Sequence, residues 1–210
     1  MKYIIANWKM YFEYEEVEAW LRYFKADSKH EIIIAPSFPF LNLVTKHKVA
    51  AQDISEHEEG SFTGSVSANQ IVAYCKYCIV GHSEINDSLE VKIKKMDVCI
   101  ANKITPIVCF KDLSELNSIE REGVLLVWED PENISKNGEF EKVDLELTRK
   151  TYSDIRKLVS PTASVLYGGS VNRQNIQELV KMGIDGVLVG HASIDPTHFV
   201  DIVRAFDNVD

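Results

Sequence analysis

Three residues that could act together in acid–base chemistry follow apolar, strand-like runs: Lys9, His82 and Glu129. A carboxylate that emerges from a buried strand keeps apolar groups around it, and the loss of water makes it a stronger base. A histidine in a turn before a helical segment lies near amide dipoles that favour its neutral form. A lysine supplies local positive charge, and Glu84 is placed to pair with Lys9. Taken singly, each residue is also compatible with an ordinary surface position, but together they indicate proton transfer on an anionic ligand.

Two glycine-bearing turns form a second chemical feature, residues 168–170 and 190–193, each after a predicted strand. Glycine lets the backbone come close to an anion, and N–H groups at the start of a helix bind phosphate. Each turn alone is weak evidence, because turns between strands and helices use glycine for many reasons. Two of them after the last two strands favour a phosphate site.

Alternating strands and helices must position these groups. The predicted strands are residues 2–7, 31–35, 49–52, 77–80, 105–109, 125–128, 164–167 and 186–189. The predicted helices are residues 13–27, 40–47, 68–75, 89–101, a short one within 110–123, 145–159, 172–182 and 196–205. Eight such units predict one domain, 1–210, folded as a closed (β/α)₈ barrel with shortened outer helices. An open doubly wound sheet is the alternative fold.

Composition excludes several classes of partner. The net charge of -9 argues against nucleic acid and against anionic membranes as partners. No apolar run approaches the roughly 18 residues of a membrane span, and no signal-peptide pattern is seen, so we expect a cytoplasmic protein. Cys75 and Cys78 form a C-x-x-C, but no second pair stands at metal spacing. We therefore expect Cys75, Cys78, Cys99 and Cys109 to be buried thiols, and no metal site.

Six stretches carry a resemblance to a known family. In chain order they are Asn-Trp-Lys-Met at 7–10, Gly-Ser-Phe-Thr-Gly at 60–64, Gly-His-Ser-Glu at 81–84, Thr-Pro-Ile-Val-Cys at 105–109, Val-Leu-Tyr-Gly-Gly-Ser-Val at 165–171 and Asp-Gly-Val-Leu-Val-Gly at 185–190. In this combination and order the chain resembles the triosephosphate isomerase family over essentially its whole length. The resemblance implies a TIM barrel and the interconversion of glyceraldehyde 3-phosphate and dihydroxyacetone phosphate, with no cofactor.

The resemblance also implies residue roles. Glu129 would be the base, a neutral His82 would polarise the carbonyl, and Lys9 and Asn7 would stabilise the enediolate oxygens. Glu84 and Ser83 would support them. The residues implied to hold the substrate phosphate are Ser135, Gly169, Ser170, Gly190 and His191.

Several positions depart from the family pattern. Asp130 stands where the family has proline, directly after the base, and we expect it to add negative charge near the anion site. Ser135 stands at the tip of the following loop, and His191 replaces a glycine beside the phosphate. Ile85 and Ser65 replace a family ion pair at both ends, which is milder than the loss of one partner.

Oligomerisation is a further expectation. The loop that holds Phe62, Thr63 and Gly64 resembles the dimer loop of the family, and trimmed outer helices leave apolar wall to cover. We therefore expect a homodimer, with a tetramer as the alternative.

Three functions remain open from the sequence. The first is a triosephosphate isomerase. The second is a barrel that binds sugar phosphates or a partner without catalysis, suggested by the altered loop tip. The third is an isomerase of a related phosphorylated aldose or ketose. Asn7, Lys9, His82 and Glu129 favour the first, because a binding protein has no need of a base and an electrophile together.

Overall fold

Eight parallel strands form a closed barrel in the computed structural model, which describes residues 2–131, 133 and 143–209. The strands are β1 (Tyr3–Asn7), β2 (Glu31–Ala35), β3 (Lys48–Ala51), β4 (Tyr77–Val80), β5 (Thr105–Phe110), β6 (Leu125–Trp128), β7 (Ser164–Tyr167) and β8 (Gly186–Val189). Each strand pairs with the next, and β8 pairs with β1, so the barrel is closed. This confirms the predicted (β/α)₈ barrel and excludes the doubly wound sheet.

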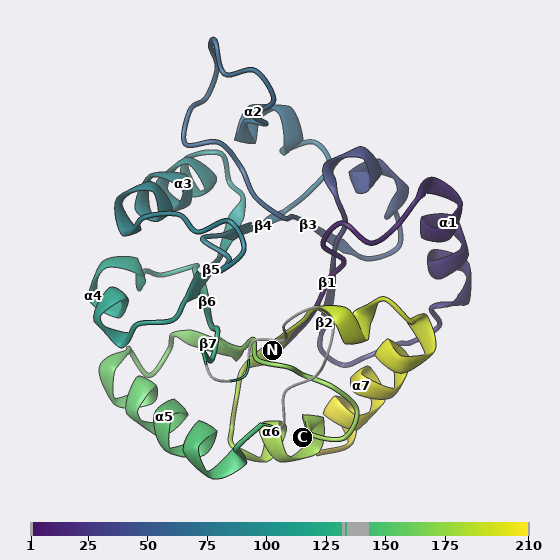
Figure 1. The fold of residues 1–210 in the computed structure, drawn as a ribbon, viewed down its shortest axis with the longest axis vertical. Helices are drawn as coiled ribbons and strands as arrows, with labels where there is room; N and C mark the ends of the chain where they lie inside the picture. Colours follow the sequence, from purple (N-terminus) through teal and green to yellow (C-terminus); the bar gives the residue numbers. More distant parts are fainter. Residues whose placement is uncertain (1, 132, 134–142, 210) are drawn as a thin grey trace.

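The helices form a ring outside the strands (Figure 1). The longer ones are α1 (Tyr14–Tyr23), α3 (Leu89–Ala101), α5 (Leu145–Leu158) and α7 (Pro196–Val209). The shorter ones are α2 (Ala68–Ile71), α4 (Leu116–Ile119) and α6 (Ile176–Lys181), joined by the 3₁₀ helices η1 (Phe38–Leu43), η2 (Leu113–Glu115) and η3 (His191–Ser193). The prediction of shortened outer helices is therefore confirmed, and the connection between β5 and β6 carries only η2 and α4.

The strand side chains build two apolar layers because they point alternately inward and outward. Ile5, Ile33 and Ile79 belong to the cluster that fills the inside of the barrel. Ile4 and Val17 belong to the larger cluster between the strands and the helices. Each fully buried side chain of this size contributes roughly 1.5–3 kcal/mol, so the two layers fix the ends of the strands in space.

Several helix boundaries differ from the predictions, for local reasons. α1 ends at Tyr23 rather than at residue 27, because the Phe24 backbone turns extended and its ring stacks on Trp20, with centroids 4.6 Å apart. The predicted helix at 40–47 is the 3₁₀ helix η1, which has proline in its first turn. α2 ends at Ile71 rather than at residue 75, since the Tyr74 N–H donates to the Ile71 carbonyl oxygen three residues back, which is a 3₁₀ bond and not an α-helical one.

All four cysteines are free and buried, as expected. Burial raises the pKa of the Cys78 and Cys109 thiols well above the ordinary value, so both stay protonated. Within residues 2–131, 133 and 143–209, no cluster of three or more His, Cys, Asp or Glu side chains could hold a metal ion. In that same part of the chain no helix is long and apolar enough to cross a membrane.

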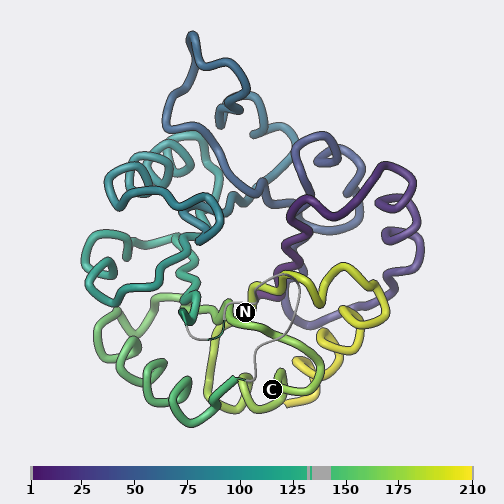
Figure 2. The backbone as a smooth tube through the Cα atoms, viewed as in Figure 1, coloured from purple at the N-terminus to yellow at the C-terminus, as the bar shows by residue number. Residues whose placement is uncertain are grey.

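The segment between β3 and α2 projects beyond the ring of helices (Figure 2). Phe62 near its tip is 43% exposed and stacks on His57, with ring centroids 3.9 Å apart. Gly64, with a φ of +89°, adopts the left-handed region that glycine allows. The three residues predicted as a dimer loop, Phe62, Thr63 and Gly64, are therefore presented to the outside.

Candidate functional site

A pocket opens at the end of the barrel where the strands terminate, and we call it the mouth pocket. Its lining is Asn7, Lys9, His82, Ser83, Glu129, Gly168, Ser170, Val171, Leu188, Gly190 and His191. These residues leave β1, β4, β6, β7 and β8. The structure thus brings together eight of the predicted site residues, while Glu84 and Gly169 lie beside the lining and Ser135 lies outside the described residues.

Glu129 follows the last residue of β6 and is only 3% exposed. Its Oε2 accepts the Ser83 backbone N–H at 2.9 Å, and its Oε1 accepts the Ser83 hydroxyl at 2.8 Å. The Nε2 atom of His82 lies 3.4 Å from Oε1. A buried carboxylate needs donors of this kind, and Ser83 supplies two of them from one residue.

His82 lies in the turn after β4 and is oriented by its neighbour. The Glu84 backbone N–H donates to Nδ1 at 3.2 Å. An acceptor nitrogen carries no proton, so this bond selects the tautomer with the proton on Nε2, the atom nearest Glu129. The imidazole can therefore donate a hydrogen bond into the mouth pocket.

Gly81 shapes this same turn. Its φ of +69° lies in the left-handed region, and an added Cβ would lie 2.4 Å from Cε of Lys92. Lys92 is itself buried and pairs with Glu115 at 2.5 Å. A larger residue before His82 would therefore strain the backbone and displace a paired lysine.

Lys9 is held on both its side chain and its backbone. Its Nζ lies 2.5 Å from Glu84 Oε1, which confirms that these two residues can pair. Its φ of 51° is strained for a residue with a Cβ. The Asn7 Oδ1 accepts the Lys9 N–H at 3.1 Å, and Gln52 Nε2 donates to the Lys9 carbonyl oxygen at 2.9 Å. Strain persists only where the surroundings fix the residue, and here they fix the ammonium group at the pocket.

The two glycine-bearing turns border the pocket beside Glu129 and Lys9. An added Cβ on Gly190 would lie 3.3 Å from Lys9 Cε, so glycine lets the lysine and the β8 turn pack together. Ser170 has a φ of 41°, and its buried hydroxyl has no hydrogen-bond partner in the part of the chain that the structure describes. The ring of His191 lies against Tyr11, with centroids 5.7 Å apart. Backbone N–H groups, a free hydroxyl and a lysine can together bind a phosphate.

Two asparagines fix the turn after β7, and sequence reasoning missed both. The Nδ2 groups of Asn172 and Asn175 each donate to the Ser170 carbonyl oxygen at 3.0 Å. Their Oδ1 atoms accept backbone N–H groups of the same turn, so α6 begins at Ile176 rather than at residue 172. Gln52 is the third missed residue; its signal was a polar side chain directly after an apolar run.

Asp130 lies beside the mouth pocket and not in its lining, so the expectation that its charge acts near the anion stays a prediction. Its side chain is not in the pocket lining, although the residue is only 4% exposed. Its Oδ2 instead accepts a hydrogen bond from Asn133 Nδ2 at 2.6 Å and from the Tyr167 hydroxyl at 3.4 Å. Neighbouring residues on an extended backbone point to opposite sides, and Glu129 takes the pocket side.

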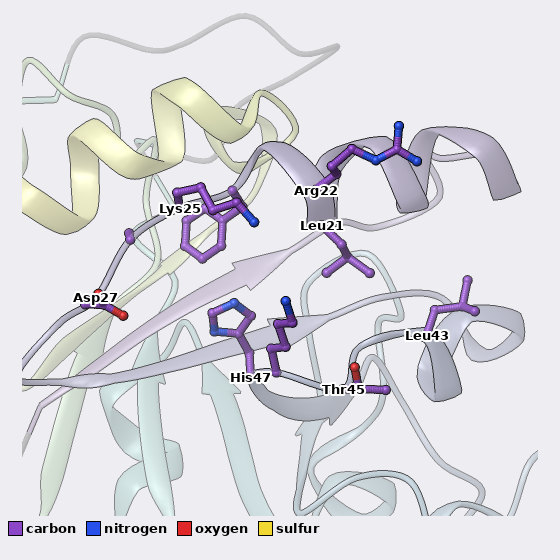
Figure 3. Close-up of a pocket in the computed structure, with 10 residues that line it drawn as sticks. Leu21, Arg22, Lys25, Asp27, Leu43, Thr45 and His47 are labelled. Atoms are coloured by element: carbon purple, nitrogen blue, oxygen red, sulfur yellow. The ribbon is translucent and has the colours of Figure 1, made fainter.

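A second hollow lies at the other end of the barrel, and we call it the basal hollow (Figure 3). Its lining is Leu21, Arg22, Phe24, Lys25, Ala26, Asp27, Leu43, Thr45, Lys46 and His47. Lys25, after α1, and His47, before β3, lie on facing walls. Burial lowers the pKa of His47, and the charges of Lys46 and Lys25 lower it further against the opposing effect of Asp27.

Comparisons with known proteins place the whole chain in one family. A family model described as triosephosphate isomerase matches residues 2–130 and 133–206. A triosephosphate isomerase of Dictyoglomus turgidum is 33% identical over 97% of this chain and 99% of the relative. The triosephosphate isomerase of Aquifex aeolicus is 32% identical over 97% of this chain and 98% of the relative. That of Mesomycoplasma hyopneumoniae is 30% identical over 96% of this chain and 98% of the relative.

Proposed function

The chain belongs to the triosephosphate isomerase family and is an isomerase of triose phosphates, and we propose that Glu129 is its catalytic base. The reaction interconverts D-glyceraldehyde 3-phosphate and dihydroxyacetone phosphate by moving a proton between adjacent carbons through an enediolate. The observation that supports the assignment is the convergence of Glu129, His82 and Lys9 in one pocket from three different strands.

The carboxylate of Glu129 can accept a proton while Ser83 holds it. Ser83 donates one hydrogen bond to each carboxylate oxygen, and each oxygen keeps a second lone pair that can accept the proton from the substrate carbon. The bonds from Ser83 keep the base in place during the transfer. Glu129 then returns the proton to the adjacent carbon, which completes the isomerisation.

His82 and Lys9 stabilise the negative charge that develops on the substrate oxygens. The Nε2–H of His82 donates to one oxygen, and the ammonium of Lys9 supplies the opposite charge for the intermediate. Asn7 uses its Oδ1 for the Lys9 N–H, which leaves its Nδ2 group as a further donor. Both side chains are preset by hydrogen bonds within the protein, so little reorganisation is needed.

The phosphate of the substrate binds between the turns after β7 and β8. Gly169, Ser170, Gly190 and His191 supply backbone N–H groups there, and the Ser170 hydroxyl is placed to add a donor. The support is the orphaned hydroxyl and the closeness of Gly190 to Lys9. Ser135, also assigned to the phosphate by resemblance, stays a prediction.

A coupled assay of glyceraldehyde 3-phosphate isomerisation tests this function, with ribose 5-phosphate as the related substrate. We expect turnover of the triose phosphate and at most a trace with the pentose phosphate. Preferential turnover of the pentose would support the alternative isomerase. Phosphate binding without turnover of either substrate would support the binding-only barrel.

We also propose that two copies associate through the loop of Phe62, Thr63 and Gly64. The loop projects outward (Figure 2), and Met10 at the mouth is 93% exposed. Exposed large apolar side chains such as Met10 and Phe62 are suited to contact with a second copy. Removal of residues 61–64 should yield monomers with weak activity. Sedimentation measures the mass in solution, and an unchanged mass in the shortened chain contradicts this proposal.

A further inference from the structure

The buried side chain of Asp130 links the exits of two strands that carry the proposed site. It follows the base Glu129 directly, and its carboxylate turns away from the mouth pocket toward β7 and α5. Its Oδ2 lies 3.4 Å from the hydroxyl of Tyr167, the last residue of β7, and 3.4 Å from the hydroxyl of Thr148 on α5. One oxygen therefore receives hydroxyl donors from two different elements.

The chain also folds back on Asp130 locally. The Asn133 Nδ2 group donates to Oδ2 at 2.6 Å, and the Asn133 N–H donates to the Asp130 carbonyl oxygen at 3.0 Å. These bonds form a turn directly after the base. A buried carboxylate is costly unless it is hydrogen-bonded, and this arrangement satisfies Oδ2 with three neutral donors.

The turn that follows β7 packs on the same pair of residues. A Cβ added at Gly169 would lie 2.6 Å from the Tyr167 hydroxyl oxygen and 3.1 Å from Asp130 Cβ. The Gly168 N–H donates to the Trp128 carbonyl oxygen at 2.9 Å, which ties the two exits on the backbone as well. A shift of Asp130 would therefore move Glu129 on one side and the proposed phosphate turn on the other.

We propose that Asp130 is a positioning residue, which fixes the distance between the base and the phosphate turn through its bond with Tyr167. This inference rests on the proposed function, because it assigns Glu129 and residues 168–170 to one reaction. Apolar residues of similar volume often stabilise a fold as well as a buried charge does, so stability alone does not account for an aspartate here. The Tyr167 hydroxyl keeps its proton, since burial and the charge of Asp130 both raise its pKa, and it remains a donor.

A double-mutant cycle between Asp130→Ala and Tyr167→Phe tests the proposal. If both residues act through one bond, each single variant should lose about 10-fold in kcat/KM, and the double variant should lose no more than the worse single one. We expect both a lower kcat and a higher KM, because the base and the phosphate turn move together. Effects that multiply to about 100-fold in the double variant would overturn the proposal.

Tyr152→Phe is the matched control. Tyr152 is also a buried tyrosine, and its hydroxyl donates to the Val165 carbonyl oxygen at 3.1 Å, away from Asp130. This variant should lower the unfolding temperature while it leaves kcat and KM within about twofold. If Asp130→Ala behaves in the same way, Asp130 is merely structural and the proposal fails. Asp130→Asn, which keeps the shape, takes the place of Asp130→Ala if that variant does not fold.

The same cycle on the affinity for inorganic phosphate, measured by calorimetry, separates this inference from the proposed function. Absence of wild-type turnover would refute the function alone. The effects on phosphate affinity would still test whether Asp130 and Tyr167 position the turn through one bond. A double variant that loses no more affinity than the worse single variant supports the proposal, and losses that multiply overturn it.

Discussion

The two ends of the barrel hold charge in different ways. At the mouth pocket Lys9 is paired with Glu84, and Glu129 is bonded to Ser83. At the basal hollow the side chains of Arg22, Lys25 and Lys46 make no hydrogen bond or ion pair within residues 2–131, 133 and 143–209. Both ends are hollow and both carry cations, so neither property alone marks a catalytic site. The difference is that groups at the mouth hold one another in fixed positions, which electrostatic catalysis requires.

The largest expected effect is at Glu129, the proposed base. Glu129→Gln keeps the shape and removes the charge, so kcat should fall roughly 10³-fold, within the range for general bases. Affinity for inorganic phosphate should stay within a few-fold of wild type. Steady-state kinetics and calorimetry measure the two effects, with the exposed Glu122→Gln as control. If Glu129→Gln turned over substrate as fast as wild type, the mouth pocket would differ from the basal hollow in no catalytic respect and the base assignment would be wrong.

Loss of the paired lysine should come next. Lys9→Met removes the ammonium from the pocket and leaves Glu84 without its partner, so kcat/KM should fall roughly 10²-fold. The matched change at the other end is Lys25→Met. It should leave kcat/KM within about twofold, because that ammonium is exposed and has no ion pair in the described part of the chain. Equal losses in the two variants, measured in the same assay, would mean that pairing does not distinguish the ends.

Removal of a hydrogen bond that supports the proposed phosphate turn after β7 should give a smaller effect. Asn175→Ala removes the bond to the Ser170 carbonyl oxygen and the bond to the Asn172 N–H. The loss of about 1 kcal/mol for each bond should lower the unfolding temperature and raise KM a few-fold, with kcat little changed. Thermal unfolding and kinetics together check this. A fall in kcat without a rise in KM would place Asn175 nearer the base than the geometry indicates.

The smallest effect is the pH response of the basal hollow. The pKa of His47 is lowered in the fold, so as the pH falls below about 6.5 the unfolded chain binds this proton first. The stabilising effect of neutral His47 is therefore present above that pH and is lost as the pH falls through the lower, folded pKa. Urea unfolding at pH 7 and pH 5 should show a smaller acid loss in His47→Gln than in wild type.

The substitution His47→Gln should change the loss of stability in acid without changing the activity. Its kcat/KM at pH 7 should match wild type, because His47 lies at the opposite end from Glu129. A changed kcat/KM would show that the ends are coupled, and an identical acid loss in both chains would contradict the assigned pKa direction.

The sequence predicts which residues follow the ends of the strands better than it predicts the hydrogen bonds that hold those residues. Lys9, His82 and Glu129 could be placed at one end because each follows an apolar run, and parallel strands all end at the same rim. The two hydrogen bonds from Ser83 to Glu129 could not be predicted, since they depend on the register of β4 against β5 and of β5 against β6. The direction of Asp130 likewise depends on the path of the chain after β6, and local pattern does not contain that path.

Helix boundaries show the same limit. α3 begins and ends where periodicity predicts, residues 89–101, because Ser88 caps it and the pattern continues to its end. α6 starts four residues late because Asn172 and Asn175 bond to the backbone of the turn instead of continuing a helix. Whether such a side chain bonds to the backbone of a turn depends on the position of the neighbouring strand end, which the local sequence does not contain.

The fit between Gly81 and Lys92 has a consequence for how this sequence can change over generations. Any side chain at residue 81 meets the stem of Lys92, and a shorter residue at 92 would remove the ion pair of the Glu115 carboxylate. Positions 81, 92 and 115 are therefore epistatic, so that a substitution tolerated at one depends on the residues at the other two. Because His82 follows Gly81, this constraint restricts the evolutionary routes by which the turn that carries His82 can be remodelled.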